Sequence, residues 1–168
     1  MKPQRRDRRD SRDGNKSEFE TKVVEIKRVT RVVAGGKRMR FRALVVSGDK
    51  KGRVGIGLKK GADVAEAVSK AGAQARKLMA RVPIKDGTIP YALKYKYKAA
   101  MVFLKPARPG SGITAGGPVR AVLTLAGIKN ISSKMLGASN KVSNVRATFE
   151  ALKSLKAPPA EEAVPSAK

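Results

Sequence analysis

Hydrophobic and polar residues alternate in the first part of the chain, and this alternation predicts three strands. Residues 19–33 are rich in Val, Ile and Thr, which is typical of a long strand. Over residues 38–47 apolar side chains alternate with arginines, so one face of this strand is expected to be buried and the other to carry cations. Gly35 and Gly36 suit a tight hairpin turn between these strands. Residues 53–57 predict a third strand, loosened by its glycines.

A helical period follows the third strand. Asp63 and Glu66 have the spacing of a capping box, with Asp63 as the N-cap. Apolar residues then recur every three or four positions as far as Leu78 and Val82, which predicts one apolar face on the helix. The first unit is therefore expected to be β-β-β-α over residues 18–82, a small sheet covered on one side by a helix.

The second half of the chain predicts a β-α-β-α unit over residues 83–156. Pro118 suits the first position of a helix, and Gly127 is expected to end that helix. An extra strand near residues 82–85 is left open. The predicted elements are a strand over 95–105 with a buried centre at 101–104, a glycine-rich loop over 106–117, a helix over 118–126, a strand over 130–136 and a helix over 142–155.

The two ends of the chain differ in composition from the rest. Residues 1–17 are dense in arginine and contain one Met as their only large apolar residue. Such a segment does not bury enough surface to order itself, so we expect a disordered basic arm. Whether it contacts a partner or is only a solvated tail stays open. Residues 157–168 are rich in proline and are also expected to be disordered.

Charge narrows the class of partner. The chain has 38 Lys and Arg residues against 13 Asp and Glu, a formal net charge of +25 over 168 residues. A chain this basic repels itself unless a polyanion neutralises it, and nucleic acid is the leading candidate. A membrane is the weaker one, because no apolar stretch approaches the ~20 residues that span a bilayer. The N-terminus also lacks the apolar core of a secretory signal, so an intracellular protein is expected.

Missing residue types argue against an enzyme. The chain has no His, Cys or Trp, and no carboxylate between Asp86 and Glu150, a stretch that holds ten Lys or Arg residues. The usual proton shuttle, thiol nucleophile and zinc ligands are therefore absent. We expect no catalytic residues, no metal site, no cofactor and no small-molecule substrate.

The loop from Pro109 to Gly117 resembles a nucleotide-binding motif only by its letters. Gly110, Gly112 and Ala115 match the spacing of a dinucleotide fingerprint, but the acidic residue expected ~20 positions further on is absent. What remains is a glycine-rich backbone before a helix, whose amides are expected to face an anion such as an RNA phosphate. A loop that simply needs tight turns is the alternative.

Tyrosine alternates with lysine around the start of the predicted strand at 95–105. Tyr91, Tyr95 and Tyr97 flank Lys94, Lys96 and Lys98, an arrangement that suits either base stacking or packing of one strand face. We favour packing.

Several longer motifs resemble one known family, bacterial-type small-subunit ribosomal protein five, and the resemblance covers about residues 18–155 in the family's order. The motifs in the first half are Gly35-Gly36-Lys37, Gly48-Asp49-Lys50-Lys51-Gly52-Arg53-Val54-Gly55-Ile56-Gly57 and Ala65-Glu66-Ala67-Val68-Ser69-Lys70-Ala71, and those in the second are Gly110-Ser111-Gly112-Ile113, Arg120-Ala121-Val122-Leu123 and Gly137-Ala138-Ser139-Asn140. The arginine-rich arm and the proline-rich tail depart from the family.

The resemblance implies an α+β fold of two small α/β domains. The first is similar to a double-stranded-RNA-binding domain, and the second is a β-α-β-α unit with a left-handed crossover, against the usual right-handed rule. It implies a structural constituent of the small ribosomal subunit, cytoplasmic and ribosome-bound, which binds small-subunit ribosomal RNA and supports assembly. The expected neighbours are small-subunit proteins four and eight and incoming messenger RNA, which the family helps to grip and unwind.

The resemblance also places function along the chain. The loop matching residues 34–38 lies near the spectinomycin-binding region of the RNA, and the surface linked to decoding accuracy matches residues 110–120. The residues expected to contact ribosomal RNA are Arg28, Arg31, Gly35, Gly36, Lys37, Arg38, Arg40, Arg42, Lys50, Lys51, Arg53, Lys59, Lys60, Lys105, Arg108, Gly110, Ser111, Gly112, Arg120, Asn140 and Lys141.

Two rival classes remain. The second domain's fold is shared by small-molecule kinases, although the missing carboxylates argue against an enzyme. A free RNA chaperone would have the same composition, and only the motifs separate it from a ribosomal component.

Overall fold

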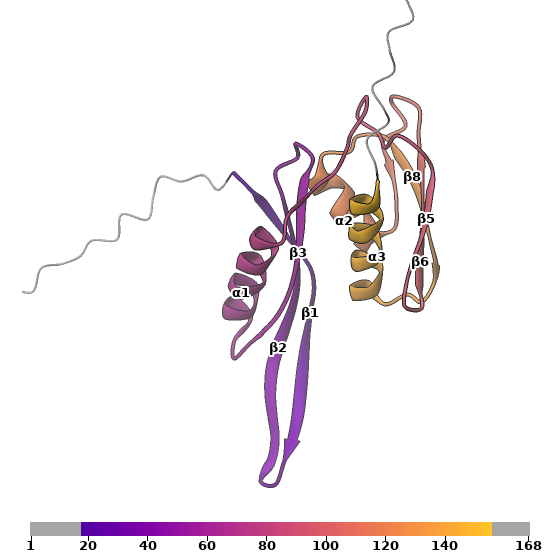
Figure 1. The fold of residues 1–168 in the computed structure, drawn as a ribbon. Helices are drawn as coiled ribbons and strands as arrows, with labels where there is room; N and C mark the ends of the chain where they lie inside the picture. The colour runs from indigo at the N-terminus through magenta and orange to yellow at the C-terminus, as the bar shows by residue number, and fades with distance from the viewer. Residues whose placement is uncertain (1–17, 156–168) are drawn as a thin grey trace, which may run out of the picture.

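The computed structural model describes residues 18–155, so the basic arm and the tail predicted at the two ends lie outside the described residues. The part of the chain that is described forms two four-stranded sheets and three helices (Figure 1). In chain order the elements are β1 (Glu20–Val33), β2 (Gly36–Gly48), β3 (Arg53–Gly61), α1 (Val64–Lys77), β4 (Ala80–Arg81), β5 (Leu93–Tyr97), β6 (Ala100–Pro106), β7 (Ile113–Thr114), α2 (Gly117–Ala126), β8 (Ile131–Gly137) and α3 (Lys141–Ser154).

The elements stack in four layers. The first sheet has the strand order β1-β2-β3-β4, and the second has the order β5-β6-β8-β7. Helix α1 lies on one side of the first sheet, while α2 and α3 lie between the two sheets (Figure 1). Residues of β2 show why: Ala43 and Val45 pack with α1, whereas Leu44 and Val46 belong to the core shared with α2 and α3. The predicted α+β class with two α/β units is confirmed.

Glycines in β3 let α1 approach the first sheet closely. A Cβ on Gly55 would overlap the carbonyl oxygen of Ala75, and a Cβ on Gly57 would overlap that of Ala71. The small side chains of the helix and the bare backbone of the strand thus meet directly. The glycines therefore allow close packing of α1 on β3, where the sequence indicated a loosened strand. The strand also extends to Gly61, beyond the predicted end at residue 57.

Helix α1 begins as predicted but ends early. The Asp63 side chain accepts a hydrogen bond from the amide of Val64 at 2.7 Å, and Glu66 accepts one from the amide of Ala62 at 2.6 Å. Leu78 is the C-cap, so the expectation that the helix reaches Val82 is wrong. The chain turns instead into β4, which pairs with β3. In place of an extra strand at residues 82–85 there is only an isolated bridge between Lys85 and Thr88.

The single strand predicted over residues 95–105 is wrong, because the structure has a hairpin there. Strands β5 and β6 are antiparallel, with Tyr97 opposite Ala100. Lys98 makes the turn with a φ of 55°, a left-handed conformation that its residue type does not signal. Val102 and Leu104 are buried as expected, but the Phe103 side chain points to the other side of the sheet and is 37% exposed.

Helix α2 connects two parallel strands. Strands β7 and β8 pair in parallel, with Ile113 opposite Ile131, and α2 lies between them in the chain. Pro118 stands in the first turn, and Gly127 ends the helix in the left-handed conformation, as predicted. The β-α-β-α order is thus extended by β5 and β7. The left-handed crossover that the resemblance implies stays a prediction.

The predicted boundary between residues 82 and 83 also stays a prediction. Val82 is buried in the core that both sheets share through α2 and α3, and its amide donates to the carbonyl oxygen of Gly52 at 2.7 Å.

Candidate nucleic-acid interface

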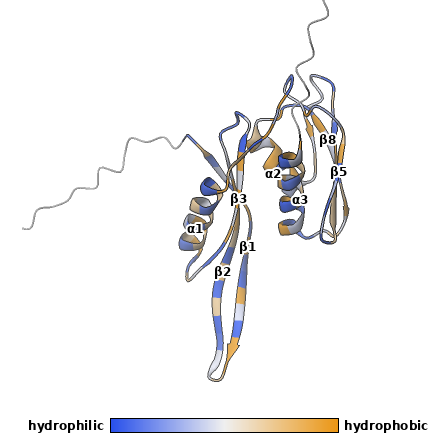
Figure 2. Ribbon diagram, viewed as in Figure 1, coloured by the Kyte–Doolittle hydropathy of each residue, from blue (hydrophilic) through white to orange (hydrophobic). Residues whose placement is uncertain are grey.

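The hairpin of β1 and β2 projects beyond the helices. Every residue from 31 to 40 is exposed, and no helix covers this end of the hairpin within the described chain (Figure 1). Figure 2 shows hydrophilic and hydrophobic residues mixed along it. A strand pair this long with no core of its own needs a partner to fix it.

The register of the hairpin gathers its cations on one face. Residues directly opposite in an antiparallel pair share a face, and Arg31 lies opposite Arg38, Val29 opposite Arg40, and Lys27 opposite Arg42. Lys60 of β3 continues this face, because it lies opposite Arg42 on the other side of β2. We call this surface the cationic hairpin face; it consists of Lys27, Arg31, Arg38, Arg40, Arg42 and Lys60.

The opposite face of the hairpin mixes apolar and polar side chains. Thr30 lies opposite Met39, Val32 opposite Lys37, and Arg28 opposite Phe41. Val32 is 73% exposed. Of the predicted contact residues, Arg28 and Lys37 therefore lie away from the cationic hairpin face, while Gly35 and Gly36 form the tip.

The cationic hairpin face is not neutralised from within the described chain. Of its six residues only Lys27 has an ion-pair partner among residues 18–155, namely Glu25 at 3.5 Å. Two like-charged pairs lie directly opposite across the strands, Arg31 with Arg38 and Lys27 with Arg42, an arrangement that is unfavourable without a counter-charge. A shallow groove runs along the face, lined by Val29, Thr30, Arg31, Arg38, Arg40 and Lys60. A polyanion laid in this groove would relieve the repulsion.

A second-unit residue reaches the base of the hairpin. Lys141 at the start of α3 lies 3.8 Å from the carboxylate of Glu25, whose side chain is only 11% exposed. Asn140 caps the same helix, with its Oδ1 accepting from the amide of Val142 at 3.0 Å. Of these two predicted contact residues, Lys141 thus extends the cationic surface onto α3, whereas Asn140 holds the start of the helix. Lys27, which the sequence analysis missed, was recognisable from the hairpin register opposite Arg42.

The predicted residues around the turn between β2 and β3 lie at the other end of the first sheet. Arg53 is already engaged: it donates to Asp49 at 2.6 Å and to Glu18 at 2.7 Å, and its guanidinium lies 5.1 Å from the ring centre of Phe19. Hydrogen bonds to Asp49 and Glu18 raise the pKa of Arg53. This arginine therefore holds the turn, and its contact with ribosomal RNA stays a prediction.

The same turn joins the two sheets. The amide of Lys50 donates to the carbonyl oxygen of Leu125 at 3.0 Å, and the amide of Gly52 donates to that of Ala126 at 2.9 Å. These acceptors are final carbonyls of α2, which have no partner within the helix. The Lys50 ammonium pairs with Glu20, whereas Lys51 is exposed.

The glycine-rich loop does not present free amides at its centre. The amides of Gly110 and Gly112 both donate to Oδ1 of Asn130, each at 3.1 Å, so these two amides are already paired within the chain, and contact of the loop with an RNA phosphate stays a prediction. Arg120 donates from its guanidinium to the carbonyl oxygen of Ile113 at 2.8 Å. Three further predicted residues, Arg108, Ser111 and Lys59, are exposed, and Lys105 lies on the outer face of the second sheet.

Two of the three tyrosines pack, as favoured from the sequence, whereas Tyr91 is 41% exposed. Tyr95 and Tyr97 are half-buried against the core. The hydroxyl of Tyr97 accepts a hydrogen bond from Arg146 at 2.9 Å. Lys94 and Lys96 point to the opposite side of the sheet and are exposed.

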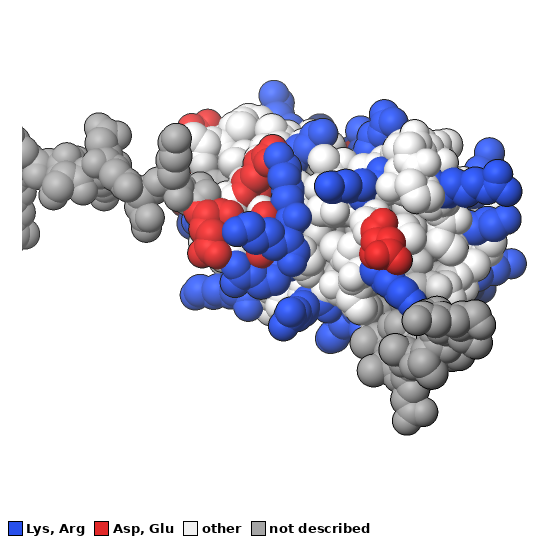
Figure 3. Space-filling view, turned by 90° about the horizontal axis from the view of Figure 1, so that it is seen from above, with Lys and Arg blue, Asp and Glu red and all other residues white. Residues whose placement is uncertain are grey.

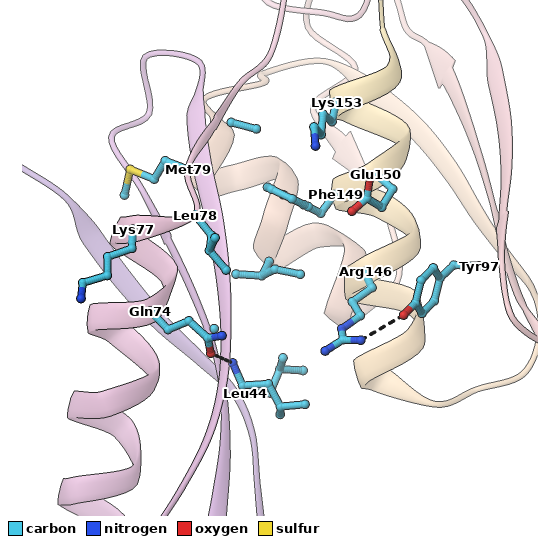
Figure 4. A pocket seen from close by; sticks show the side chains of 14 residues that line it. Leu44, Gln74, Lys77, Leu78, Met79, Tyr97, Arg146, Phe149, Glu150 and Lys153 are labelled. Atoms are coloured by element: carbon cyan, nitrogen blue, oxygen red, sulfur yellow. Dashed lines mark hydrogen bonds between the residues drawn. The ribbon is translucent and has the colours of Figure 1, made fainter.

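A cleft between the two units has walls of mixed chemistry. Figure 4 shows it between α1 and α3, with Lys77, Arg146 and Lys153 among its lining residues. Glu150 is its single carboxylate, so the lining offers no pair of acidic groups for acid–base chemistry. Over residues 18–155 there is no group of metal-ligating side chains and no helix long and apolar enough to cross a membrane.

The fold and the charge together define the class. Figure 3 shows lysine and arginine side chains around much of the surface seen from above, with acidic side chains confined to small groups. A basic two-unit α+β protein with an unneutralised hairpin face is typical of RNA-binding proteins. The chain belongs to the ribosomal protein S5 family: the model of that family's N-terminal domain matches residues 19–83, and the model of its C-terminal domain matches residues 95–163.

Curated relatives agree with the family models. The chain is 49% identical over 146 residues to the small ribosomal subunit protein uS5 of Dehalococcoides mccartyi strain 195, covering 87% of this chain and 85% of the relative. It is 48% identical over 148 residues to the protein of the same name from strain CBDB1, covering 88% and 86%.

Proposed function

We propose that this chain is a structural component of the small ribosomal subunit and binds ribosomal RNA without catalysing a reaction. Membership of the ribosomal protein S5 family supports this role, as do relatives named small ribosomal subunit protein uS5. The chain is then a ribosome-bound protein of the cytoplasm. It acts by bridging RNA elements with two packed α/β units.

The observation that carries the proposal is the cationic hairpin face. Five of its cations, Arg31, Arg38, Arg40, Arg42 and Lys60, have no ion-pair partner among the residues that the structure describes. Guanidinium groups bind phosphate oxygens in a bidentate manner, and each contact releases counterions. A hairpin with like charges directly opposite each other, Arg31 with Arg38 and Lys27 with Arg42, is therefore stabilised when RNA phosphates lie along it.

Finer roles follow from the family resemblance. The hairpin tip at residues 34–38 is proposed to lie near the spectinomycin-binding region of the RNA, and residues 110–120 to form the surface linked to decoding accuracy. Small-subunit proteins four and eight and incoming messenger RNA are the proposed neighbours. Asn130 supports the role proposed for residues 110–120, because its side chain accepts hydrogen bonds from the amides of Gly110 and Gly112 and so holds that backbone in one conformation.

We also propose that the chain divides into two domains at residues 82 and 83. Residues 18–82 are proposed as the RNA-binding-like domain and residues 83–156 as the second domain, with hydrogen bonds from Lys50 and Gly52 to α2 fixing their relative placement.

Incorporation into small subunits tests the function. A tagged copy is expected to sediment stoichiometrically with small subunits after a stringent salt wash. The double variant Arg38→Gln/Arg40→Gln is expected to be lost in that wash, because it removes two unpaired cations from the cationic hairpin face. Arg76→Gln/Lys153→Gln removes the same charge from the exposed surfaces of α1 and α3 and is expected to be retained.

The outcomes separate this function from its rival. Recovery of the unmodified chain only in non-ribosomal fractions would contradict the proposal and favour a free RNA chaperone. Equal loss of both double variants would mean that total charge, and not the hairpin, determines binding.

A further inference from the structure

The outer face of the second sheet is a second surface with a defined chemistry. Helices α2 and α3 cover only the inner face of this sheet, where Val102, Leu104 and Ile131 are buried. No described segment covers the outer face (Figure 1). Side chains alternate between the two faces along each strand. We call this surface the open sheet face; its residues are Lys94, Lys96, Met101, Phe103, Lys105, Ser132, Lys134 and Leu136.

An aromatic ring lies at the centre of the open sheet face, between two lysines. Phe103 lies opposite Lys94 on β5 and opposite Lys134 on β8, so the three side chains form one row across the sheet. Phe103 is 37% exposed although it belongs to the central strand β6. One exposed ring would be ordinary, but Phe103 belongs to an apolar strip with Met101 and Leu136 on the same face, and a continuous exposed apolar patch is typical of a surface that contacts a partner.

The neighbouring rows continue the same pattern. Met101 lies opposite Lys96 and Leu136, and Leu136 is 39% exposed. On the other side of the Phe103 row, Lys105 lies opposite Ser132. Each row therefore combines a cation with a side chain that is apolar or small.

No acid among residues 18–155 neutralises the open sheet face. The sequence has no carboxylate between Asp86 and Glu150, and all of this face lies in that stretch. Its four lysines, Lys94, Lys96, Lys105 and Lys134, form no ion pair within residues 18–155. The charge complement of this surface is thus a polyanion that also offers flat apolar faces.

We infer that the open sheet face binds an unpaired segment of ribosomal RNA, with a base stacked on Phe103 and the adjacent phosphates on Lys94 and Lys134. Unpaired bases expose π-faces that stack on aromatic side chains, and a positive surface tracks the backbone beside them. The inference rests on the proposed ribosomal RNA binding and adds a second contact, specific for unpaired nucleotides.

Other partners fit this face less well. An RNA duplex hides the flat faces of its bases inside the stack, so it would meet the lysines but not the ring. A protein surface would have to remove the four lysines from water and supply a carboxylate for each. The ring and the cations together therefore favour unpaired RNA.

Binding of a single-stranded oligonucleotide tests the inference on the full chain. The Arg38→Gln/Arg40→Gln background weakens the hairpin contact, and the probe is a labelled oligoadenylate of ~10 nucleotides, within the site sizes of single-strand binders. Phe103→Ala is expected to weaken binding about tenfold, the effect of losing one stacked base. Phe103→Tyr keeps the ring and is expected to bind as the parent does. Thermal unfolding checks that both variants fold.

A duplex of the same length provides the matched probe. Phe103→Ala is expected to leave duplex binding unchanged, because the ring contacts only unpaired bases. Unchanged oligoadenylate binding by Phe103→Ala, or an equal loss for the duplex, would overturn the inference. Neither result bears on incorporation of the chain into small subunits, so failure here is distinguishable from failure of the proposed function.

A photo-reactive benzoylphenylalanine at position 103 identifies the partner in assembled small subunits. Irradiation is expected to give an adduct to ribosomal RNA that maps to an unpaired segment. The same label at Ala73, exposed on α1, measures the adducts that an unrelated surface position gives. An adduct to a protein, an adduct to messenger RNA alone, or no excess over position 73 would overturn the assignment.

Discussion

A Cβ atom on Gly127 would overlap the carbonyl oxygen of Lys50, although Lys50 belongs to the first unit and Gly127 to the second. Gly127 ends α2 with a φ of 89°, and Lys50 lies in the turn between β2 and β3. The amide of Lys50 in turn donates to Leu125 of the same helix. The two units are thus joined backbone to backbone, which fixes the cationic hairpin face relative to the open sheet face.

Gly127→Ala is expected to destabilise the chain strongly, because it adds both backbone strain and a steric overlap at this junction. Gly110→Ala is the matched control: its φ is 90°, but no atom lies within 4 Å of its Cβ position. Strain alone costs about 1–2 kcal/mol, so Gly110→Ala should lose no more than that. Urea unfolding measures both, and equal losses would show that the close approach to Lys50 has no effect on stability.

Gly57→Ala is expected to lower the free energy of unfolding by more than about 3 kcal/mol, at the upper end of the cost of overpacking. Its Cβ would overlap the carbonyl oxygen of Ala71, so α1 would have to move away from the first sheet. Gly35→Ala is the control, since nothing lies within 4 Å of its Cβ position at the hairpin tip. A near-neutral Gly57→Ala in urea unfolding would contradict the close packing of α1 on β3.

Strands β2 and β3 show which features of the fold can be predicted from the sequence and which cannot. Alternating arginines in β2 predict a strand with one buried and one exposed face, and this is wrong: residues 36–40 are exposed on both faces, Met39 included, and residues 43–48 are buried on both, because α1 and the second unit cover only that end of the strand. The alternate glycines of β3 leave open whether a strand is loose or closely covered, because the answer lies in α1, whose Ala71 and Ala75 sit far along the chain. The spacing of residues within a segment indicates whether it is a strand or a helix. It does not indicate which other element packs on it.

The second unit was harder to predict for a related reason. The turn between β5 and β6 contains Lys98 in a left-handed conformation where Gly or Asn is usual, so the sequence predicts one strand in place of two. Because residues 95–105 were predicted as one strand with a buried centre at 101–104, the exposure of Phe103 on the outer face of the sheet was not predicted. The engagement of Arg53 with Glu18 was equally hidden, because these residues are far apart in sequence and meet only through the first sheet.

Asp49 is expected to make stability depend on pH. Partial burial raises the pKa of its carboxyl, but the hydrogen bonds from Arg53 and from the amides of Lys51 and Arg53 outweigh it, so the pKa lies below its ordinary value. Between the folded pKa and the unfolded value of about 3.9 the unfolded chain binds more protons, so this contribution is complete above about pH 4 and is lost as pH falls through the folded pKa.

The Asp49→Asn variant isolates this contribution. It should be less stable than the parent near pH 7, and the difference in unfolding free energy should shrink below about pH 4. Urea unfolding across this range is the measurement. A difference that stays constant with pH would show that the ionised carboxyl is not the stabilising form.

Asn130→Ala is expected to loosen the glycine-rich loop, because the amides of Gly110 and Gly112 lose their shared acceptor. An unsatisfied donor costs about 1–3 kcal/mol where water does not reach it. Amide hydrogen exchange at the two glycines should quicken, while Asn130→Asp keeps an acceptor oxygen and should retain protection. Unchanged exchange in Asn130→Ala would mean that other interactions hold the loop.

The salt dependence of RNA binding is expected to show how many hairpin cations contact RNA phosphates. Each bound phosphate releases counterions, so the slope of log affinity against log salt concentration falls by roughly one unit for each phosphate that a variant no longer binds. Arg38→Gln/Arg40→Gln should therefore reduce the slope for a ribosomal RNA fragment by roughly two units. Arg76→Gln/Lys153→Gln carries the same net charge and should leave the slope close to that of the parent, because these residues lie on α1 and α3 away from the hairpin. A slope that depends only on net charge would place the RNA-binding surface elsewhere on the chain.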